Sequence, residues 1–373
     1  MPNDDTRPPY PYIKFLSHIH LTYSNETAIS KRRLDPDHLN SFGFEWLLGF
    51  ITQTDTYCAF TDHSEVMSGG EWRLACKTAT DWQAQGLPCF SGFEWTKGSI
   101  FDKDCTHIIV INTSKYAATQ ALIPDCDADI IPTLNGLYTW LNNNLGEQGF
   151  WGFPHPWAGE DPYDGFKKPK YQKVVDRCCF VEIGSELHKA DSLSKIRYFQ
   201  ALQAGLFVVP WFGPDNWGKL GKVELSNFNG IVLMEPGRNI AEKVHNAILK
   251  RRVFYCEKAG GYLLWSIWNS KYPDISKTWM GGTYHQSIFG KPDRIKFYLD
   301  QASSQSINSY TKHFIYKDQD TLTFNYKKPS TDNDKSEELF KKLFGYGDDC
   351  LAIVIEFNVN QDRTIMGAPI WID

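Results

Sequence analysis

The segment IKFLSHIH, residues 13–20, carries the pattern that decides the fold. Residues 13–18 form a short run of mostly large apolar side chains, which is typical of a buried β-strand, and His18 and His20 stand at its end. Side chains two positions apart on an extended chain point to the same side, so both imidazoles project in one direction. The segment therefore predicts a buried strand that delivers two metal-ligand side chains at its carboxyl end.

Similar apolar runs alternate with longer amphipathic segments through the first two thirds of the chain. The expected strands are residues 13–18, 57–61, 88–93, 107–112, 149–153, 178–183 and 206–212. The expected helices are residues 38–54, 70–85, 133–144, 191–204 and 240–252. Strand–helix alternation repeated about seven times implies a parallel sheet. At this length we predict an α/β fold whose sheet closes into a distorted TIM-like (β/α)7 barrel, with its active site at the carboxyl ends of the strands.

The last third of the chain has a different pattern of short alternating segments. Strands are expected at residues 262–268, 294–299, 313–316, 321–326, 351–357 and 369–371. Residues 328–337, rich in Ser, Asp, Asn and Lys, are expected to form a loop. We therefore predict a barrel over residues 1–255 and a small antiparallel β domain over residues 256–373.

Composition limits the classes of function. The net charge of −5 and the lack of a long basic run argue against a nucleic-acid partner. No apolar stretch approaches the roughly 18 residues of a membrane span. Nine scattered cysteines without a CxxC spacing indicate buried free thiols. We expect a cytoplasmic protein that acts on a small molecule, and the oligomeric state stays open.

Metal-ligand side chains fall at corresponding places along the predicted strands. They are His18, His20, Asp62, His63, Glu94, His107, His155, Glu182 and Asp215. Each alone is weak, because a histidine or a buried carboxylate more often has a structural role. Together they predict one cavity at the carboxyl ends of the strands, since parallel strands end at the same edge. Imidazoles with carboxylates suit Zn, Mn or Fe, and buried carboxylates need cations nearby.

The order of these motifs resembles the polymerase and histidinol phosphatase superfamily, PHP. His18-Ile19-His20 is similar to its first motif, Thr61-Asp62-His63 to its second, and Glu94 to its bridging glutamate. His107 and His155 match its two middle histidines, and Glu26 stands at its third-ligand position. The resemblance implies a barrel that holds two or three metal ions.

Other segments resemble the carbaryl (carbamate) hydrolase branch of that superfamily. They are Gly92-Phe93-Glu94-Trp95-Thr96, Arg251-Arg252-Val253-Phe254-Tyr255, Trp279-Met280-Gly281-Gly282 and Ala368-Pro369-Ile370-Trp371. One motif departs from the superfamily, because Asp215-Asn216-Trp217 stands where Asp-x-His is usual. The resemblance then implies two strong sites, with His18, His20, Glu94 and Asp215 at one and Glu94, His107 and His155 at the other. The third site, of Glu26 and His63, is expected to be weakened or empty.

The implied activity is metal-dependent hydrolysis by a metal-activated water. Asp62 is a candidate to orient a ligand histidine, and Glu182 is a candidate for supporting the ligands from behind. His188 is a candidate general acid, although a solvated loop histidine is the plainer interpretation.

We expect phosphoester hydrolysis first, and two alternatives stay open. Phosphoester hydrolysis suits the metals, but aromatic residues flank the ligands where a phosphatase often has arginine. These residues are Trp95, Trp157, Trp211 and Trp217. They favour a carbamate or carboxylic ester or amide if they line the substrate pocket, and they are simply core if they do not. A degenerate binding module without catalysis is a further alternative.

Overall fold

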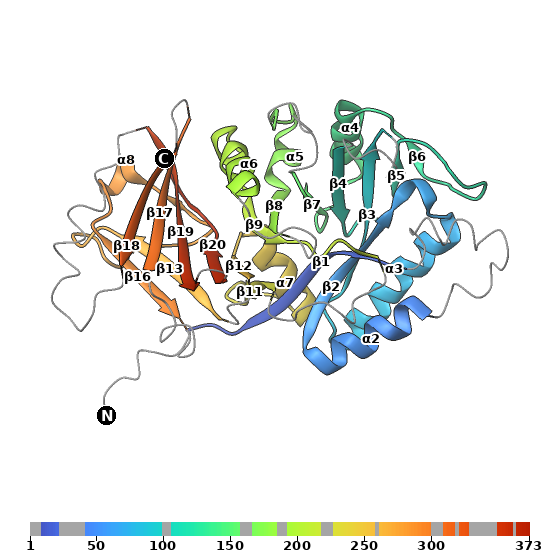
Figure 1. Ribbon diagram of the computed structural model, residues 1–373, viewed down its shortest axis with the longest axis horizontal. Helices are drawn as coiled ribbons and strands as arrows, with labels where there is room; N and C mark the ends of the chain where they lie inside the picture. Colours follow the sequence, from blue (N-terminus) through green and yellow to red (C-terminus); the bar gives the residue numbers. More distant parts are fainter. Residues whose placement is uncertain are drawn as a thin grey trace.

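The computed structural model describes residues 9–21, 42–98, 106–156, 166–184, 192–217, 227–257, 261–299, 309–317, 321–327, 349–360 and 363–373. These residues form a mixed α/β fold with one large sheet and few helices (Figure 1). In that view the mixed α/β part lies on the right and the C-terminal strands lie on the left.

The expected strands of the first part are all present with shifted ends. The strands are β1 (Tyr12–His20), β2 (Thr56–His63), β3 (Phe90–Lys97), β4 (Thr106–Ile111), β7 (Phe150–Phe153), β8 (Cys178–Gly184) and β9 (Val209–Phe212). Two that were not predicted, β11 (Phe228–Val232) and β12 (Val253–Glu257), follow later, and β5 (Ala117–Ala118), β6 (Asp129–Ile130) and β10 (Asn216–Trp217) are short. The helices are α2 (Phe42–Thr54), α3 (Gly69–Ala84), α4 (Leu134–Asn144), α5 (Gln172–Asp176), α6 (Ser192–Gln203) and α7 (Ile240–Leu249).

The C-terminal part is mostly antiparallel strands, as expected. Its elements are β13 (Leu263–Trp268), β14 (Thr278–Trp279), β15 (Thr283–Tyr284), α8 (Gln286–Phe289), β16 (Arg294–Leu299), β17 (Ser309–Tyr316), β18 (Leu322–Lys327), β19 (Cys350–Asn360), β20 (Arg363–Gly367) and β21 (Ile370–Ile372). Here β14, β13 and β16 form a separate three-stranded sheet. The others join the large sheet through β20, which pairs with β12. The expected loop at residues 328–337 lies outside the described residues.

The regular (β/α)7 alternation is not what the structure has. The strand order runs β1-β2-β3-β4-β7-β8-β9, but β4 is antiparallel to both β3 and β7. The connection between the end of β3 at Lys97 and the start of β4 at Thr106 is too short for the crossover that a parallel strand requires. An apolar run such as that of β4 predicts burial and carries no information on strand direction, so the prediction of seven parallel units was wrong at this strand.

The sheet nevertheless turns back towards its first strand. The short β10, which follows β9 closely, pairs in parallel with the end of β1. Nearer the start of β1, the side chain of Asn229 on β11 joins β1 to β9. Its Nδ2 donates to the carbonyls of Phe15 on β1 and Phe212 on β9, and its Oδ1 accepts from the Phe212 amide. One buried amide side chain therefore supplies the hydrogen bonds that a direct β1–β9 pairing would supply.

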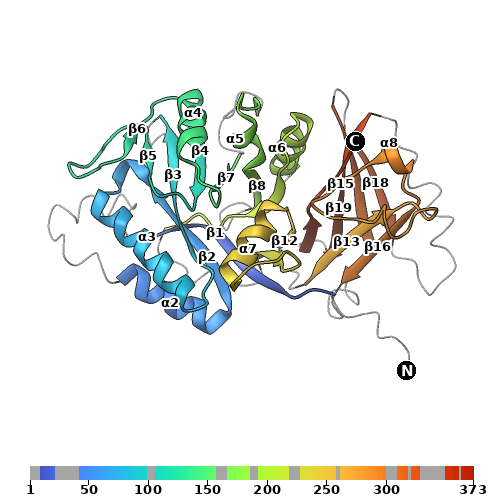
Figure 2. The same cartoon turned by 180° about the vertical axis from the view of Figure 1, so that it is seen from behind.

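Helices cover the outer side of this curved sheet, as Figures 1 and 2 show. α3 begins at a capping box in which the Ser68 hydroxyl accepts from the Glu71 amide and the Glu71 carboxylate accepts from the Ser68 amide. α2 contacts β2, α3 contacts β3, and α7 contacts β11. The helices thus bury the outer face of the strands that carry the predicted ligands.

The predicted division at residue 255 falls inside β12, and the large sheet is continuous across it through β12 and β20. The two-domain division stays a prediction. Cys58, Cys89, Cys178 and Cys179 are buried and free, as expected. Among the described residues, none of the helices has the length and apolar character needed to cross a membrane.

Candidate metal centre

The buried carboxylate of Glu94, on β3, lies at the centre of the predicted cluster. Its Oε2 is 3.3 Å from His18 Nε2, 3.2 Å from His20 Nε2 and 3.3 Å from His63 Nδ1. Its Oε1 is 3.2 Å from His155 Nε2 and hydrogen-bonded to His107 Nδ1. Each oxygen of one carboxylate therefore faces a different set of imidazoles, which is the arrangement expected of a carboxylate that bridges two cations.

The topology explains how these side chains meet. His18 and His20 end β1, and His63 ends β2, which pairs in parallel with β1 and β3. His107 is at the start of β4, yet it reaches the same edge because β4 is antiparallel to β3 and His107 is the register partner of Thr96. The antiparallel strand that breaks the predicted barrel pattern is thus the one that brings His107 next to Glu94.

Glu182, on β8, contacts His18 on the side of its ring that faces away from Glu94. Its carboxylate oxygens lie 3.1 and 3.3 Å from His18 Nδ1, and its Oε2 accepts a 3.0 Å hydrogen bond from the amide of His155. A carboxylate only accepts, so His18 Nδ1 carries the proton, and in the neutral ring the lone pair of Nε2 faces Glu94 and His20. These contacts place Glu182 next to His18 and His155, and its role in supporting metal ligands stays a prediction.

Two of the cluster residues have left-handed backbone conformations. His155 has φ 27° and Asp215 has φ 47°, which is uncommon for residues other than glycine. The amide of Asp215 donates to the carbonyl of His18, and its Oδ1 lies 3.3 Å from His20 Nε2 and 3.6 Å from His18 Nε2. Backbone strain of this kind collects at functional sites, where surrounding contacts hold it in place.

The donor atoms fit metal ions in both chemistry and spacing. Three groups have their ligand atoms within 4.8 Å of one another: His18 with His20 and Asp215, His18 with Glu94 and His155, and His20 with His63 and Glu94. Around a Zn, Mn or Fe ion with bonds of about 2.1 Å, neighbouring ligand atoms are roughly 3.0–3.4 Å apart. Four separations among His18, His20, Glu94 and Asp215, of 3.1–3.3 Å, match the edges of such a polyhedron, and that between His18 and Asp215 is slightly longer at 3.6 Å.

The electrostatics of the cavity favour positive charge. Burial lowers the pKa of His18, but the carboxylates of Glu182, Glu94 and Asp215 outweigh it and raise that pKa well above the ordinary value. Burial opposes the charge of His20 too, yet hydrogen bonds to Asp215 and Glu94 raise its pKa to about 9. At His63 burial prevails and lowers the pKa to about 3. Burial raises the pKa of Glu94, but the surrounding imidazoles hold it well below its ordinary value.

The described part of the chain brings most of the predicted ligands together. His18, His20, His63, Glu94, His107, His155 and Asp215 converge on one buried cluster. Asp62 is close by, with its Oδ1 accepting from the amide of Leu21 just after the His18–His20 pair. It fixes the chain at the end of β1. Glu26, His188 and Trp157 lie outside the described residues.

The predicted aromatic rim is corrected by the structure. Trp95 and Trp211 are both fully buried. Trp95 Nε1 donates to the carbonyl of Ile131, and Trp211 donates to the hydroxyl of Ser17 while its ring stacks on Phe180. Both are core residues. Trp95 directly follows Glu94 on β3, so its side chain points to the opposite face of the sheet. Trp211 is the register partner of Glu182 on β8 and is buried on the same face as that residue, against Ser17 and Phe180. Trp217 lies in β10, and its side chain is outside what the structure describes.

One residue of the cluster was missed in the sequence. The hydroxyl of Thr96 lies 3.3 Å from His63 Nδ1, and the Thr96 amide donates to the buried carboxylate of Glu65. Thr96 stands two positions after Glu94 on the same strand, so the period of two could have identified it. Glu65 belongs to a short 3₁₀ turn after β2 (Ser64–Val66), where no pattern marks it.

Comparisons with known proteins add little to this geometry. No protein-family model and no curated protein matches the chain. A solved structure of a proposed metal-dependent phosphoesterase from Bifidobacterium adolescentis is similar over 65% of this chain and 97% of that protein, at 12% identity and a TM-score of 0.31. That TM-score is too low to carry an argument, and nothing in these comparisons supports the carbaryl hydrolase branch.

Proposed function

We propose that the chain is a metal-dependent hydrolase with a PHP-type centre, most simply a phosphoesterase. One observation carries the proposal: a single buried carboxylate, Glu94, is surrounded by the imidazoles of His18, His20, His63, His107 and His155. Burying so many polar groups is costly unless they coordinate an ion. A purely structural core would gain nothing from this cluster.

The ligand sets follow from the contacts. One ion would be held by His18, His20, Asp215 and Glu94, and a second by Glu94, His107 and His155. His63 is close enough to Glu94 and His20 to complete a third set, for which the remaining ligands fall on residues that the structure does not describe. We propose two strong sites and a weaker third.

The centre would supply a hydroxide near neutral pH and an electrophile for the substrate oxygen. The chain's own residues prepare for this chemistry. Glu182 keeps the proton of His18 on Nδ1 and, through the amide of His155, ties β7 to β8. Asp62 anchors the backbone after His20. These contacts fix the donors before any substrate arrives, which reduces the reorganisation that the reaction requires.

Phosphoesters are the substrate class that the proposal favours. Two cations held by a shared carboxylate suit the spread of charge on a phosphoryl group. The argument for a carbamate or carboxylic ester rested on aromatic residues around the ligands, and Trp95 and Trp211 are core residues. That alternative now depends on Trp157 and Trp217 alone.

An activity panel tests the proposal. The zinc- or manganese-loaded protein is assayed with p-nitrophenyl phosphate, bis(p-nitrophenyl) phosphate and an aryl N-methylcarbamate. We expect turnover of a phosphoester that is lost with chelator and lost in H18A. Turnover of the carbamate alone would favour the other hydrolase class.

The matched control is H285A. His285 is an exposed histidine whose Nδ1 contacts the carboxylate of Asp373 in the C-terminal part, away from the cluster. Its replacement should leave turnover and metal content unchanged. If no substrate is turned over in a manner that needs both metal and His18, the result favours a binding module over the proposed activity.

A further inference from the structure

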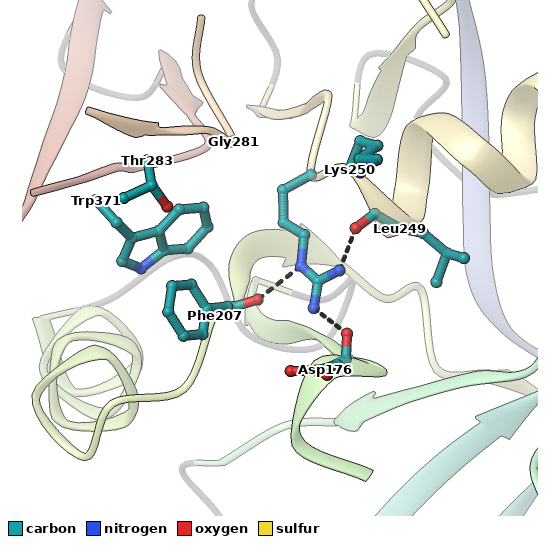
Figure 3. Close-up of a pocket in the computed structure, with 8 residues that line it drawn as sticks. Asp176, Phe207, Leu249, Lys250, Gly281, Thr283 and Trp371 are labelled. Carbon is teal, nitrogen blue, oxygen red and sulfur yellow. Dashed lines mark hydrogen bonds between the residues drawn. The ribbon is translucent and has the colours of Figure 1, made fainter. Parts of the chain in front are cut away.

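A second cavity lies at the edge of the sheet where β8 and β9 begin, opposite the edge that carries the metal centre. Its volume is about 290 Å³. Figure 3 shows residues that line it. The lining residues are Asp176, Phe207, Leu249, Lys250, Arg251, Gly281, Thr283 and Trp371. Asp176 and Phe207 precede β8 and β9, whereas the metal centre lies at the opposite edge of the sheet, where β1 ends at His20 and β2 ends at His63. The length of β8, at about 3.3 Å per residue, separates the two sites by roughly 20 Å.

One wall of the cavity is aromatic. The rings of Phe207 and Trp371 lie with their centroids 5.0 Å apart and their planes tilted by 52°. Figure 3 shows both side chains on the same side of the cavity, next to Thr283. Phe207 is 38% exposed, which is a large fraction for a phenylalanine. An apolar surface held open in a cavity is typical of a small-ligand site.

The opposite wall carries positive charge without a carboxylate partner. Arg251 is only 6% exposed, and its guanidinium donates to the carbonyls of Phe207, Leu249, Asp176 and Cys178. Carbonyl dipoles satisfy its hydrogen bonds but leave its net charge in place. Lys250 beside it is exposed, and within the described ranges it forms no ion pair.

The acidic group of the cavity is Asp176. It is exposed, and its Oδ1 accepts from Gln172. The lining residues thus contribute two cations and one carboxylate, Lys250 and Arg251 against Asp176. The net charge next to the aromatic wall is positive, so an anionic group is favoured there over a cationic one.

The cavity is preformed. The amide of Gly281 donates to the carbonyl of Pro369, and the amide of Trp371 donates to the carbonyl of Gly282. Gly281 has φ 80° and lies so close to the turn after α7 that a Cβ on it would be 2.3 Å from the carbonyl oxygen of Arg251. These contacts fix the C-terminal wall against the end of α7, so a ligand would meet a rigid site and lose little free energy to reordering.

We propose that this cavity binds a small molecule that combines a flat apolar ring with a carboxylate or another anionic group. The ring lies against Phe207 and Trp371, and the anion is attracted by Lys250 and Arg251. The proposal is independent of the hydrolase assignment, because the cavity shares no residue with the metal centre. Its walls come from the residues before β8 and β9, from the end of α7 and from the C-terminal residues, so ligand binding stabilises the contacts among them.

A matched series of probes tests the charge preference. Binding of 1-naphthoate, 1-naphthalenemethanol and 1-naphthylmethylammonium is measured by isothermal titration and by the shift in melting temperature, with the full chain. We expect 1-naphthoate to bind one site per chain with a submillimolar Kd and at least about 10-fold more tightly than the ammonium compound. A 10-fold ratio corresponds to about 1.4 kcal/mol. No binding of 1-naphthoate, or equal binding of the ammonium compound, overturns the proposal.

Two variants locate the site. K250E reverses the exposed cation, and T283F fills the space beside Trp371; both should weaken 1-naphthoate at least 10-fold. K243E is the matched control, because Lys243 is an exposed lysine of the same helix that does not line the cavity. Circular dichroism verifies that each variant folds. If K250E and T283F bind 1-naphthoate as the wild type does, the ligand sits elsewhere and the assignment of this cavity is wrong.

Discussion

At the scale of single residues, the cluster around Glu94 shows what strand-end patterns can and cannot predict. The ligand candidates were identifiable because each stands where an apolar run ends or begins, and strand ends share an edge. The alternation of side chains along β3 also places Trp95, which directly follows Glu94, on the opposite face, so its burial in the core could have been inferred. The burial of Trp211 could not, because it shares a face with its register partner Glu182 and only the packing against Ser17 and Phe180 decides its position. The hydroxyl of Thr96 could have been identified by the same period of two, because Thr96 stands two positions after Glu94.

Replacing Glu182 by Gln tests how the ligands are oriented. The amide replaces one of the two carboxylate oxygens beside His18 Nδ1 with an NH2 donor and removes the negative charge next to that ring. We expect metal affinity to fall about 10–100-fold, as is usual for groups that support a ligand histidine. Competition with a chromophoric chelator measures this. E147Q, at an exposed position, is the control, and an E182Q affinity equal to that of the control would contradict the role.

Arg251 occupies a position where glycine is usual. α7 ends with the amide of Arg252 donating to Ala247 and that of Arg251 to Ile248, with Arg251 at φ 57°. R251G would relieve the left-handed backbone, a gain of about 1 kcal/mol, but would remove the donors from the buried carbonyl of Cys178, at about 1–3 kcal/mol, and from three partly buried carbonyls at a smaller cost each. We expect a net loss of about 2 kcal/mol or more in the free energy of unfolding, measured with urea. A stabilised R251G would show that the side chain contributes less than the backbone strain costs.

At the scale of elements, most helices and strands follow from periodicity, but their directions do not. β4 was predicted as a strand at almost its observed residues, and its antiparallel direction could have been inferred from the short connection to β3. β11 and β12 were not predicted as strands. β11 lies between a segment outside the described residues and the helix α7, and β12 follows α7. The run of apolar residues in each is only a few residues long.

The contact of α6 with the C-terminal strands gives a pH dependence. Glu356 on β19 is buried and is bonded by Lys195 of α6 and by His313 of β17. Burial raises its pKa, but these partners outweigh that effect and lower it to about 2. A depressed carboxyl pKa contributes stability that is complete above the unfolded pKa of about 4.3 and is lost as the pH falls towards the folded value.

We expect this group to contribute about 3 kcal/mol at neutral pH, of which about 1 kcal/mol is lost by pH 3.5. The measurement is the urea unfolding free energy of the wild type and of E356Q at pH 6.0 and pH 3.5. The decrease between the two pH values should be about 1 kcal/mol smaller in E356Q. An identical decrease in both proteins would show that Glu356 titrates normally in the folded state.

At the scale of the whole molecule, a curved sheet carries a metal-ligand cluster at one end and a charged aromatic cavity at the other. The sequence indicated the first end, because ligand side chains are chemically distinctive. It did not indicate the second, because Phe207, Lys250 and Trp371 come together only when the C-terminal strands pack beside α7. Sites built from distant ordinary residues leave no local signal.

Removal of metal should destabilise the whole chain. Without metal cations, the buried carboxylates and imidazoles around Glu94 no longer have the positive ions that their arrangement favours. In addition, ions that bind only the folded state stabilise that state by mass action. We expect dialysis against EDTA to lower the melting temperature by roughly 5 °C or more, and zinc or manganese to restore it. H18A should show little response to either treatment. A melting temperature that ignores EDTA in the wild type would argue against a structural contribution of the ions.

The most direct measurement is the number of metal ions per chain in the wild type and in E94A, by inductively coupled plasma mass spectrometry after reconstitution and desalting. E356Q, which alters a buried carboxylate far from the cluster along the sequence, is the control. The account predicts two tightly held ions per chain in the wild type and in E356Q, and fewer than one in E94A. Fewer than one ion in the wild type, or two in E94A, would contradict the Glu94-bridged centre, and three tightly held ions would contradict the weakened third site.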